Sequence, residues 1–199
     1  MDHKEIYLIG KKVVLRDITL DDIKTIYHNT YLANDREHLK WNAPYQEIEP
    51  ISFDEYLTKE KDSLNKTGTD KIRSKLAIEV DGRLIGRVSW YWVDETTNWL
   101  CNGLVIFDSN YWSGGYGTDA FDLWTDYIFC HMDVARVGIS TWSGNERMIR
   151  LAQRIGMIEE GRIRKARIVN GEYFDSIKMG ILREEWEQRK MDLSHVVKE

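Results

Sequence analysis

The sequence predicts a single α/β domain built around one sheet of mixed, mostly antiparallel sense. Three observations support this fold class. Strand-like and helix-like hydrophobic patterns alternate along the chain, Asp-Gly and Asn-Gly pairs separate strand-like runs, and a glycine-rich turn leads from a strand into a helix. At 199 residues and 42% hydrophobic content, the chain can bury one sizeable core. We expect one domain over residues 1–199, with its core at about 11–186 and a polar C-terminal tail.

The first predicted strand passes directly into a helix. Residues 13–18 alternate with the period of two that is typical of a strand. Thr19 then begins a capping-box-like signal, and apolar residues recur at three- and four-residue steps to about Tyr31, which predicts an amphipathic helix. Residues 34–45 form an irregular segment, and a further capping signal at Ser52 predicts a second helix.

A hairpin is the clearest prediction in the middle of the chain. Residues 75–80 and 84–93 are strand-like, and the Asp-Gly pair between them accepts the positive backbone angles of a tight turn. A second turn at 94–97 leads into an apolar strand at 99–107. The sheet is therefore expected to be antiparallel up to this point.

The glycine-rich turn at 113–117 opens a helix that is followed by another strand and another helix. Residues 137–142 are strand-like, Ser143 and Glu146 form a capping pair for the next helix, and Gly156 is placed to end it. The apolar face of the first of these two helices is expected to comprise Ala120, Trp124, Tyr127, Ile128 and His131.

Two further strands close the predicted sheet. They span about 159–169 and 173–182, and the Asn-Gly pair between them is a type I′ turn signal. The tail from Glu184 is expected to be helical at first. The predicted order is therefore β-α-α-β-β-β-α-β-α-β-β.

Composition excludes several classes of protein. The formal net charge of −5 gives no attraction to nucleic acid or to anionic membranes and mildly favours a cationic partner. Cys101 and Cys130 lack the spacing of a disulfide framework or a zinc site, so we expect no metal and a reduced, cytoplasmic setting. A charged N-terminus and the lack of an apolar run of about 20 residues predict a soluble protein with no membrane partner.

The glycine-rich turn has two interpretations from its residues alone. Gly114, Gly115 and Gly117 directly before a helix can aim several backbone N–H groups at one anion, such as a phosphate. They can equally make a tight strand-to-helix connection. A P-loop is excluded because no Gly-Lys-Ser/Thr follows, and a dinucleotide site is excluded because the candidate strand at 137–142 ends in a neutral serine.

Longer stretches resemble one family. Residues 103–108 and 111–120 look like the cofactor motif of the GNAT superfamily of N-acetyltransferases, closest to its RimJ/RimL-type branch. The motif Gln/Arg-x-x-Gly-x-Gly/Ala maps onto Trp112, Gly115 and Gly117, with Trp replacing the usual first residue. A later helix at 145–157 and the closing blocks 160–164, 170–175 and 182–186 also resemble this family. The resemblance runs from about residue 11 to residue 186.

This resemblance implies an acetyl-CoA-dependent N-acetyltransferase with helices on both faces of its sheet and two splayed strands at the cofactor site. The pantetheine arm would bind the backbone of one splayed strand, where one N–H group would face the thioester oxygen. The pyrophosphate would bind the glycine turn, and Asn145 would contact the pantetheine or the acetyl end. The implied cofactor residues are Leu104, Val105, Ile106, Trp112, Ser113, Gly114, Gly115, Tyr116, Gly117, Thr118 and Asn145.

The catalytic acid and base are not identified by the resemblance. Ala152 and Met148 occupy positions where relatives carry a tyrosine and a serine, and Cys101 lies near the place of a common glutamate. The remaining candidates for proton transfer are Tyr173, Asp175 and Glu79.

The acceptor is expected to be a primary amine on a peptide or a small molecule. Trp41 and Tyr45 lie in the irregular segment that covers the acceptor site in relatives. Residues 41–45 also resemble a Trp-Phe-Glu-Glu-Pro-Tyr stretch of spermidine acetyltransferases, but Asn42 and Ala43 replace its two glutamates, while Glu47 and Glu49 keep a polyamine possible. The alternative from another class is a non-catalytic acetyl-CoA-binding sensor or interaction module. Many relatives form homodimers, and this chain is expected to be able to.

Overall fold

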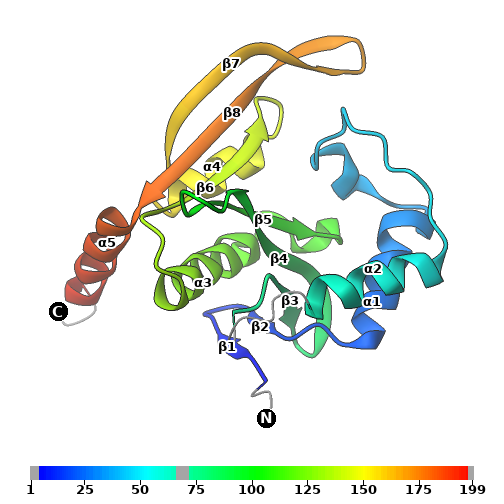
Figure 1. The fold of residues 1–199 in the computed structure, drawn as a ribbon, viewed down its shortest axis with the longest axis horizontal. Helices are drawn as coiled ribbons and strands as arrows, with labels where there is room; N and C mark the ends of the chain where they lie inside the picture. The colour runs from blue at the N-terminus through cyan, green and yellow to red at the C-terminus, as the bar shows by residue number, and fades with distance from the viewer. Residues whose placement is uncertain (1–4, 66–71, 197–199) are drawn as a thin grey trace.

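The computed structural model describes residues 5–65 and 72–196, and its centre is an eight-stranded sheet (Figure 1). The strands are β1 (Tyr7–Ile9), β2 (Val14–Arg16), β3 (Lys75–Val80), β4 (Arg83–Asp94), β5 (Trp99–Ile106), β6 (Arg136–Trp142), β7 (Ile158–Val169) and β8 (Glu172–Leu182). They lie in the order β1-β2-β3-β4-β5-β6-β8-β7, and every neighbouring pair is antiparallel except β5 and β6. The predicted mixed, mostly antiparallel sheet is confirmed.

Helices cover both faces of this sheet. They are α1 (Leu20–Tyr27), α2 (Phe53–Asn65), α3 (Tyr116–His131), α4 (Glu146–Arg154) and α5 (Arg183–Val196), with a π-helical turn at His28–Leu32 and 3-10 turns at Glu37–Lys40 and Ser109–Tyr111. Trp124 and Ile128 of α3 are fully buried against the sheet. Ile23 of α1 and Tyr56 of α2 form a second cluster, and Figure 1 shows α3 and the α1–α2 pair on opposite sides of β4 and β5.

The N-terminal region departs from the prediction at two points. β1 is an additional strand of three residues that pairs with β2, too short to produce a readable alternation. The helix predicted to reach Tyr31 is α-helical only to Tyr27 and continues as the π-helical turn. The Thr30 hydroxyl donates to the Ile26 carbonyl at 2.8 Å, and such bonds to the backbone of the preceding turn distort helices.

Two predictions on the later helices are wrong in detail. Asn145, and not Ser143, caps α4, because its Oδ1 accepts the Met148 N–H at 3.1 Å. The Ser143 hydroxyl instead accepts the Asp175 backbone N–H. His131 does not lie on the buried face of α3 but is exposed at its last turn.

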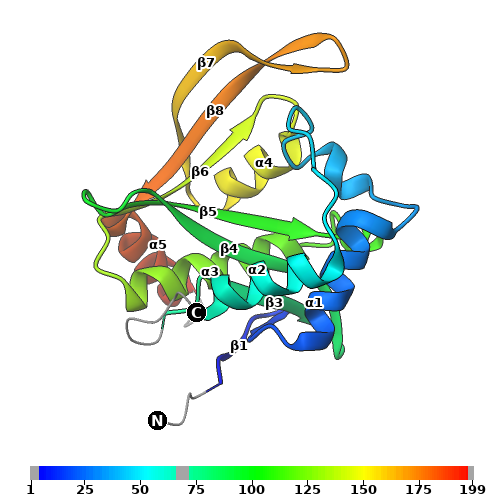
Figure 2. The same ribbon diagram turned by 45° about the vertical axis from the view of Figure 1, so that its right-hand side comes forward.

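β5 and β6 separate after their first residues. The two strands pair only at Leu100 with Val137 and at Cys101 with Gly138. From Asn102 onward β5 keeps β4 as its partner and β6 pairs with β8, so the two strands open into a V (Figure 2). Beyond Cys101, the backbone of β5 that faces this opening has no ladder partner among the described residues, which leaves peptide groups able to bind another extended chain.

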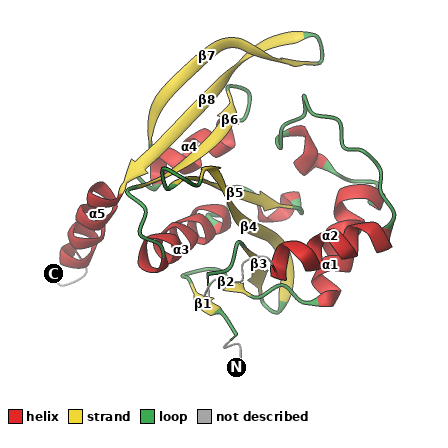
Figure 3. Ribbon diagram, in the orientation of Figure 1, coloured by secondary structure: helices red, strands yellow, loops and turns green. Residues whose placement is uncertain are grey.

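The C-terminal hairpin extends beyond the rest of the sheet as a long arm (Figure 3). Its turn has positive φ angles at Asn170 (51°) and Gly171 (82°), as the type I′ prediction requires. Arg183 then ties the start of α5 to the core, since its guanidinium donates to the Phe129, Met132 and Val134 carbonyls. None of the helices in the described ranges has the length and apolar character needed to span a bilayer.

Candidate active site

A cavity of about 450 Å³ occupies the opening between β5 and β6. Five segments line it: β5, the glycine turn with the start of α3, β6, α4, and the stretch from His38 to Tyr45. Among the residues predicted from the sequence, the lining includes Leu104, Val105, Ile106, Trp112, Ser113, Gly115, Gly117, Thr118, Asn145, Trp41 and Tyr45. Gly114 and Tyr116 belong to the same turn but do not line the cavity. The fold therefore places the predicted cofactor strand, the glycine turn and residues 38–45, hereafter the acceptor segment, around one cavity.

The glycine turn is shaped by two positive φ angles and one indole bond. Ser113 has φ 61° and Gly115 has φ 85°, and Gly115 occupies the N-cap of α3. The Trp112 indole N–H donates to the Ile106 carbonyl at 3.1 Å, which ties the turn back to the end of β5. No side chain of the described residues caps α3, so its first-turn N–H groups are available to an anion.

Asp119 fixes the first turn of α3 against the N-terminal hairpin. Its carboxylate accepts the backbone N–H groups of Lys11, Lys12 and Val13 at 3.1, 2.6 and 3.1 Å. The Lys12 ammonium consequently lies 5.5 Å from the centre of the Tyr116 ring, beside the glycine turn. No sequence pattern indicates these bonds, because they join residues more than one hundred positions apart.

Asn102 contributes an unused acceptor to the cavity. The residue is 3% exposed, and its Nδ2 donates to the Thr125 hydroxyl at 3.3 Å. Its Oδ1 is buried without a hydrogen-bond partner among the described residues. A buried polar atom of this kind normally has a partner, so this part of the cavity suits a polar ligand group such as an amide N–H of an extended arm.

Both polar atoms of the Asn145 side chain have a hydrogen-bond partner within the protein. Besides capping α4, its Nδ2 donates to the Trp41 carbonyl at 3.0 Å, and the Trp142 indole donates to the same carbonyl at 3.0 Å. The asparagine therefore holds the acceptor segment onto β6 and α4. Its predicted contact with the pantetheine stays a prediction.

Arg147 links the two sides of the cavity mouth. Its guanidinium carbon lies 4.8 Å from the centre of the Trp41 ring and 4.3 Å from the centre of the Trp112 ring. Arg150 and Arg154 of the same helix also line the cavity, and no Asp or Glu does so among the described residues. This positive lining suits a polyanionic ligand such as the diphosphate and phosphate groups of coenzyme A.

His38 is a lining residue that sequence analysis missed. Its side chain is 4% exposed, stands edge-on to the Phe107 ring at 5.3 Å, and has an Nδ1 without a hydrogen-bond partner in the described part of the chain. Burial lowers the pKa of the imidazole, so the ring is neutral at pH 7. A histidine within an irregular segment carries no periodic signal that could have singled it out.

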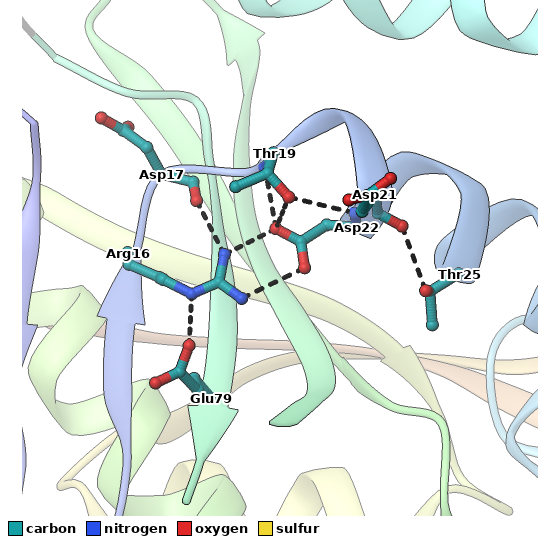
Figure 4. A network of polar contacts seen from close by, with 7 residues as sticks. All are labelled: Arg16, Asp17, Thr19, Asp21, Asp22, Thr25 and Glu79. Atoms are coloured by element: carbon teal, nitrogen blue, oxygen red, sulfur yellow. Dashed lines mark hydrogen bonds and ion pairs between the residues drawn. The ribbon is translucent and has the colours of Figure 1, made fainter. Parts of the chain in front are cut away.

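Glu79 lies outside the cavity, in the polar network of Figure 4. Its Oε2 accepts the Arg16 Nε–H at 2.5 Å, and the same guanidinium donates to Asp22 at 2.6 Å. Burial opposes ionisation of Asp22, but hydrogen bonds from Arg16 and Thr19 outweigh it and lower the pKa of this carboxyl. The network joins β2 and β3 to the start of α1.

The other two candidates for proton transfer also lie away from the cavity. The Asp175 carboxylate accepts the Lys165 backbone N–H at 2.9 Å and the Arg162 guanidinium at 3.0 Å, and these two bonds lower its pKa. Tyr173 is 62% exposed on the arm. Cys101 is buried beside Tyr91, and burial raises the pKa of its thiol, so it stays protonated.

Comparison with known proteins agrees with this arrangement. Residues 12–158 match the family model described as an acetyltransferase (GNAT) domain. The matched segment is most of the chain and includes β5, the glycine turn, β6 and α4. The protein belongs to the GNAT acetyltransferase family.

Three relatives illustrate the likeness. YokL, an SPbeta prophage-derived uncharacterized N-acetyltransferase of Bacillus subtilis, is 27% identical over 112 residues, which cover 56% of this chain and 63% of YokL, less than two thirds of its length. The spermidine N(1)-acetyltransferase of Escherichia coli strain K12 is 22% identical over 176 residues, 87% and 88% of the two chains. The crystal structure of a Vibrio cholerae spermidine N-acetyltransferase with CoA and spermine superposes with a TM-score of 0.70 at 20% identity, covering 88% and 98%.

Proposed function

We propose that this protein transfers an acetyl group from acetyl-CoA to a primary amine, on a peptide N-terminus or a small molecule. The observation that carries the proposal is the V between β5 and β6, which opens onto an uncapped glycine turn and is lined by arginines without a carboxylate among the described residues. The backbone of Leu104, Val105 and Ile106 would bind the pantetheine arm. The turn at 112–118, including Gly114 and Tyr116, would bind the pyrophosphate.

The reaction exchanges a thioester for an amide within one ternary complex. Acetyl-CoA supplies an activated acetyl group. The neutral amine nitrogen attacks the carbonyl carbon, a C–N bond forms, and the C–S bond breaks with its electron pair leaving on sulfur. The amine loses one proton and the thiolate takes up one, which gives an amide and free CoA. A β5 backbone N–H aimed at the carbonyl oxygen would contribute about 3 kcal/mol to the transition state.

None of the three carboxyl and phenol candidates lines the cavity. Glu79 is held by Arg16, Asp175 by Arg162 and Lys165, and Tyr173 is exposed on the arm. We therefore propose that proton transfer uses water within the cavity rather than these side chains. Assignment to the RimJ/RimL-type branch rests on the glycine-turn motif and the 145–157 helix.

The experiment is free-thiol release from acetyl-CoA, measured with a panel of amino acids, peptides, polyamines and aminoglycosides. Amine-dependent release supports the transferase, whereas tight acetyl-CoA binding without release for any amine supports the non-catalytic sensor. Gly117→Val is the matched loss-of-function variant, since a Cβ there lies 3.2 Å from the Leu151 Cδ1 and fills the cavity wall. Gly161→Val is its control, because a Cβ at Gly161 meets nothing within 4 Å.

A further inference from the structure

The charged side chains of the described residues that line the cavity are all positive. Arginines line it and no carboxylate does so among the described residues. Carboxylates of α4, β7 and β8 are paired with arginines: Glu146 binds Arg150, Glu160 binds Arg136, and Glu159 and Asp175 both bind Arg162. The lining arginines would face the phosphates of coenzyme A, so the charge that an acceptor meets is set by cations elsewhere around the acceptor segment.

Arg167 is a cation without an ion-pair partner in the described part of the chain, and it contacts Tyr45 of the acceptor segment without itself lining the cavity. It lies on β7 where the pairing with β8 shifts, and its guanidinium carbon is 4.7 Å from the centre of the Tyr45 ring. Tyr45 lines the cavity and meets the Trp142 ring edge-on at 6.5 Å. The aromatic wall of the acceptor segment thus carries a fixed positive charge on one of its rings.

The hydrogen-bonding capacity of Arg167 is only partly used. Its Nη1 donates to the Ala166 carbonyl at 2.9 Å, while its Nε is buried and has no partner among the described residues. A buried donor left unsatisfied is unfavourable, and a guanidinium fork matches a carboxylate in shape and charge. A polyamine offers this side chain only further positive charge.

We propose that the acceptor is a primary amine that also carries a carboxylate, and that Arg167 binds this carboxylate beside Tyr45. This inference rests on the proposed transferase activity and names its substrate class. Amino acids and peptides with an acidic residue near the N-terminus both present this chemistry. Spermidine, which has several cationic amines and no carboxylate, does not.

The first test compares matched amines with the wild-type protein. Tyrosine is paired with tyramine and phenylalanine with phenethylamine, and an Asp-containing dipeptide is paired with its Asn analogue. Because the amines differ in pKa, kcat/KM is expressed per neutral amine. In each pair, the amine with the carboxylate is expected to have a kcat/KM about ten- to hundredfold higher, because a hydrogen bond between charged groups stabilises its complex by that factor. Equal rates within each pair, or a preference for spermidine, would overturn the inference.

The second test uses three variants. Arg167→Gln is expected to reduce the carboxylate preference about tenfold while the KM for acetyl-CoA stays unchanged, and Arg167→Lys is expected to keep part of the preference. Arg164→Gln is the control, since it removes the same charge from an exposed position of the same strand. A preference that survives Arg167→Gln would contradict the assignment of Arg167.

The two proposals fail in different ways. Absence of thiol release with every amine would defeat the transferase itself. Release with many amines but without a carboxylate preference would leave the transferase standing and defeat only the substrate class. The wild-type pairs do not depend on whether any variant folds.

Discussion

Two side chains at the cavity make contacts that no sequence pattern predicts. Arg147 lies between Trp41 and Trp112, two rings from segments about seventy residues apart. His38 is buried at the cavity wall, and its Nδ1 has no hydrogen-bond partner among the described residues. Both contacts are produced by the tertiary fold, so neither periodicity nor motif spacing could have indicated them. Each leads to a prediction that concerns one residue.

Arg147→Ala is expected to raise the KM for acetyl-CoA about tenfold, with a smaller effect on kcat. The physical reason is the loss of a cation that faces the cavity and joins the two tryptophans across its mouth. Steady-state thiol-release kinetics measure the change. Gln153→Ala, exposed on the same helix, is the control. An unchanged KM would show that Arg147 has no part in cofactor binding.

His38 is expected to make the folded state sensitive to mild acid. Burial, with Arg36 and Arg87 nearby and Asp35 acting against them, lowers the pKa of His38 below 6.5 in the folded state. Between 6.5 and that lower pKa, the unfolded chain binds a proton that the folded chain does not. The free energy of unfolding therefore decreases as the pH falls through this window, by up to about 1.4 kcal/mol per pH unit.

Urea unfolding at pH 7.5, 6.5 and 5.5 measures this dependence. His38→Gln should make the curve flatter between pH 6.5 and 5.5, whereas His28→Gln, at an exposed position, should leave it unchanged. Carboxylates such as Asp22 titrate at lower pH and do not affect this window. An identical slope in the His38 variant would contradict the assignment.

At the scale of elements, short sequence signals correctly predicted turns and helix ends, which depend on neighbouring residues. The Asp-Gly and Asn-Gly hairpins, the capping box of α1 and the end of α4 at Gly156 all form as predicted. The cap of α4 was misassigned because Ser143 and Asn145 are both good capping residues, and only the bond from Asp175 decides between them. The glycine turn before α3 was predicted from the sequence. The bonds by which Asp119 attaches the start of α3 to the turn between β1 and β2 were not.

The variant Glu79→Gln tests whether Glu79 stabilises the junction of β2, β3 and α1 or takes part in catalysis. Glu79→Gln is expected to lower the free energy of unfolding by about 2 kcal/mol, because it leaves the partly buried Arg16 with one charged partner fewer. The kcat should change by less than about twofold if the residue is not catalytic. Denaturant unfolding and thiol-release kinetics are measured together, with the exposed Glu172→Gln as control. A large loss of kcat in a stable variant would restore Glu79 as a catalytic candidate.

At the scale of the whole molecule, the sequence was sufficient for the fold class and for most of the segments that surround the cavity. The glycine turn, the splayed strand and the position of Trp41 and Tyr45 meet at one cavity as the family resemblance implied. The charge beside Tyr45 was not predictable, because it depends on which arginines pair with carboxylates. Arg162 is paired, whereas Arg167 has no ion-pair partner among the described residues, although both lie on β7.

We propose that the open edge of β5 binds the pantetheine arm as a missing strand would. Amide hydrogen exchange of the protein with and without acetyl-CoA tests it most directly. We predict slower exchange in residues 102–106 and in the first turn of α3, because arm and pyrophosphate would bond to these N–H groups. Tight acetyl-CoA binding that leaves both segments unprotected would contradict the claim.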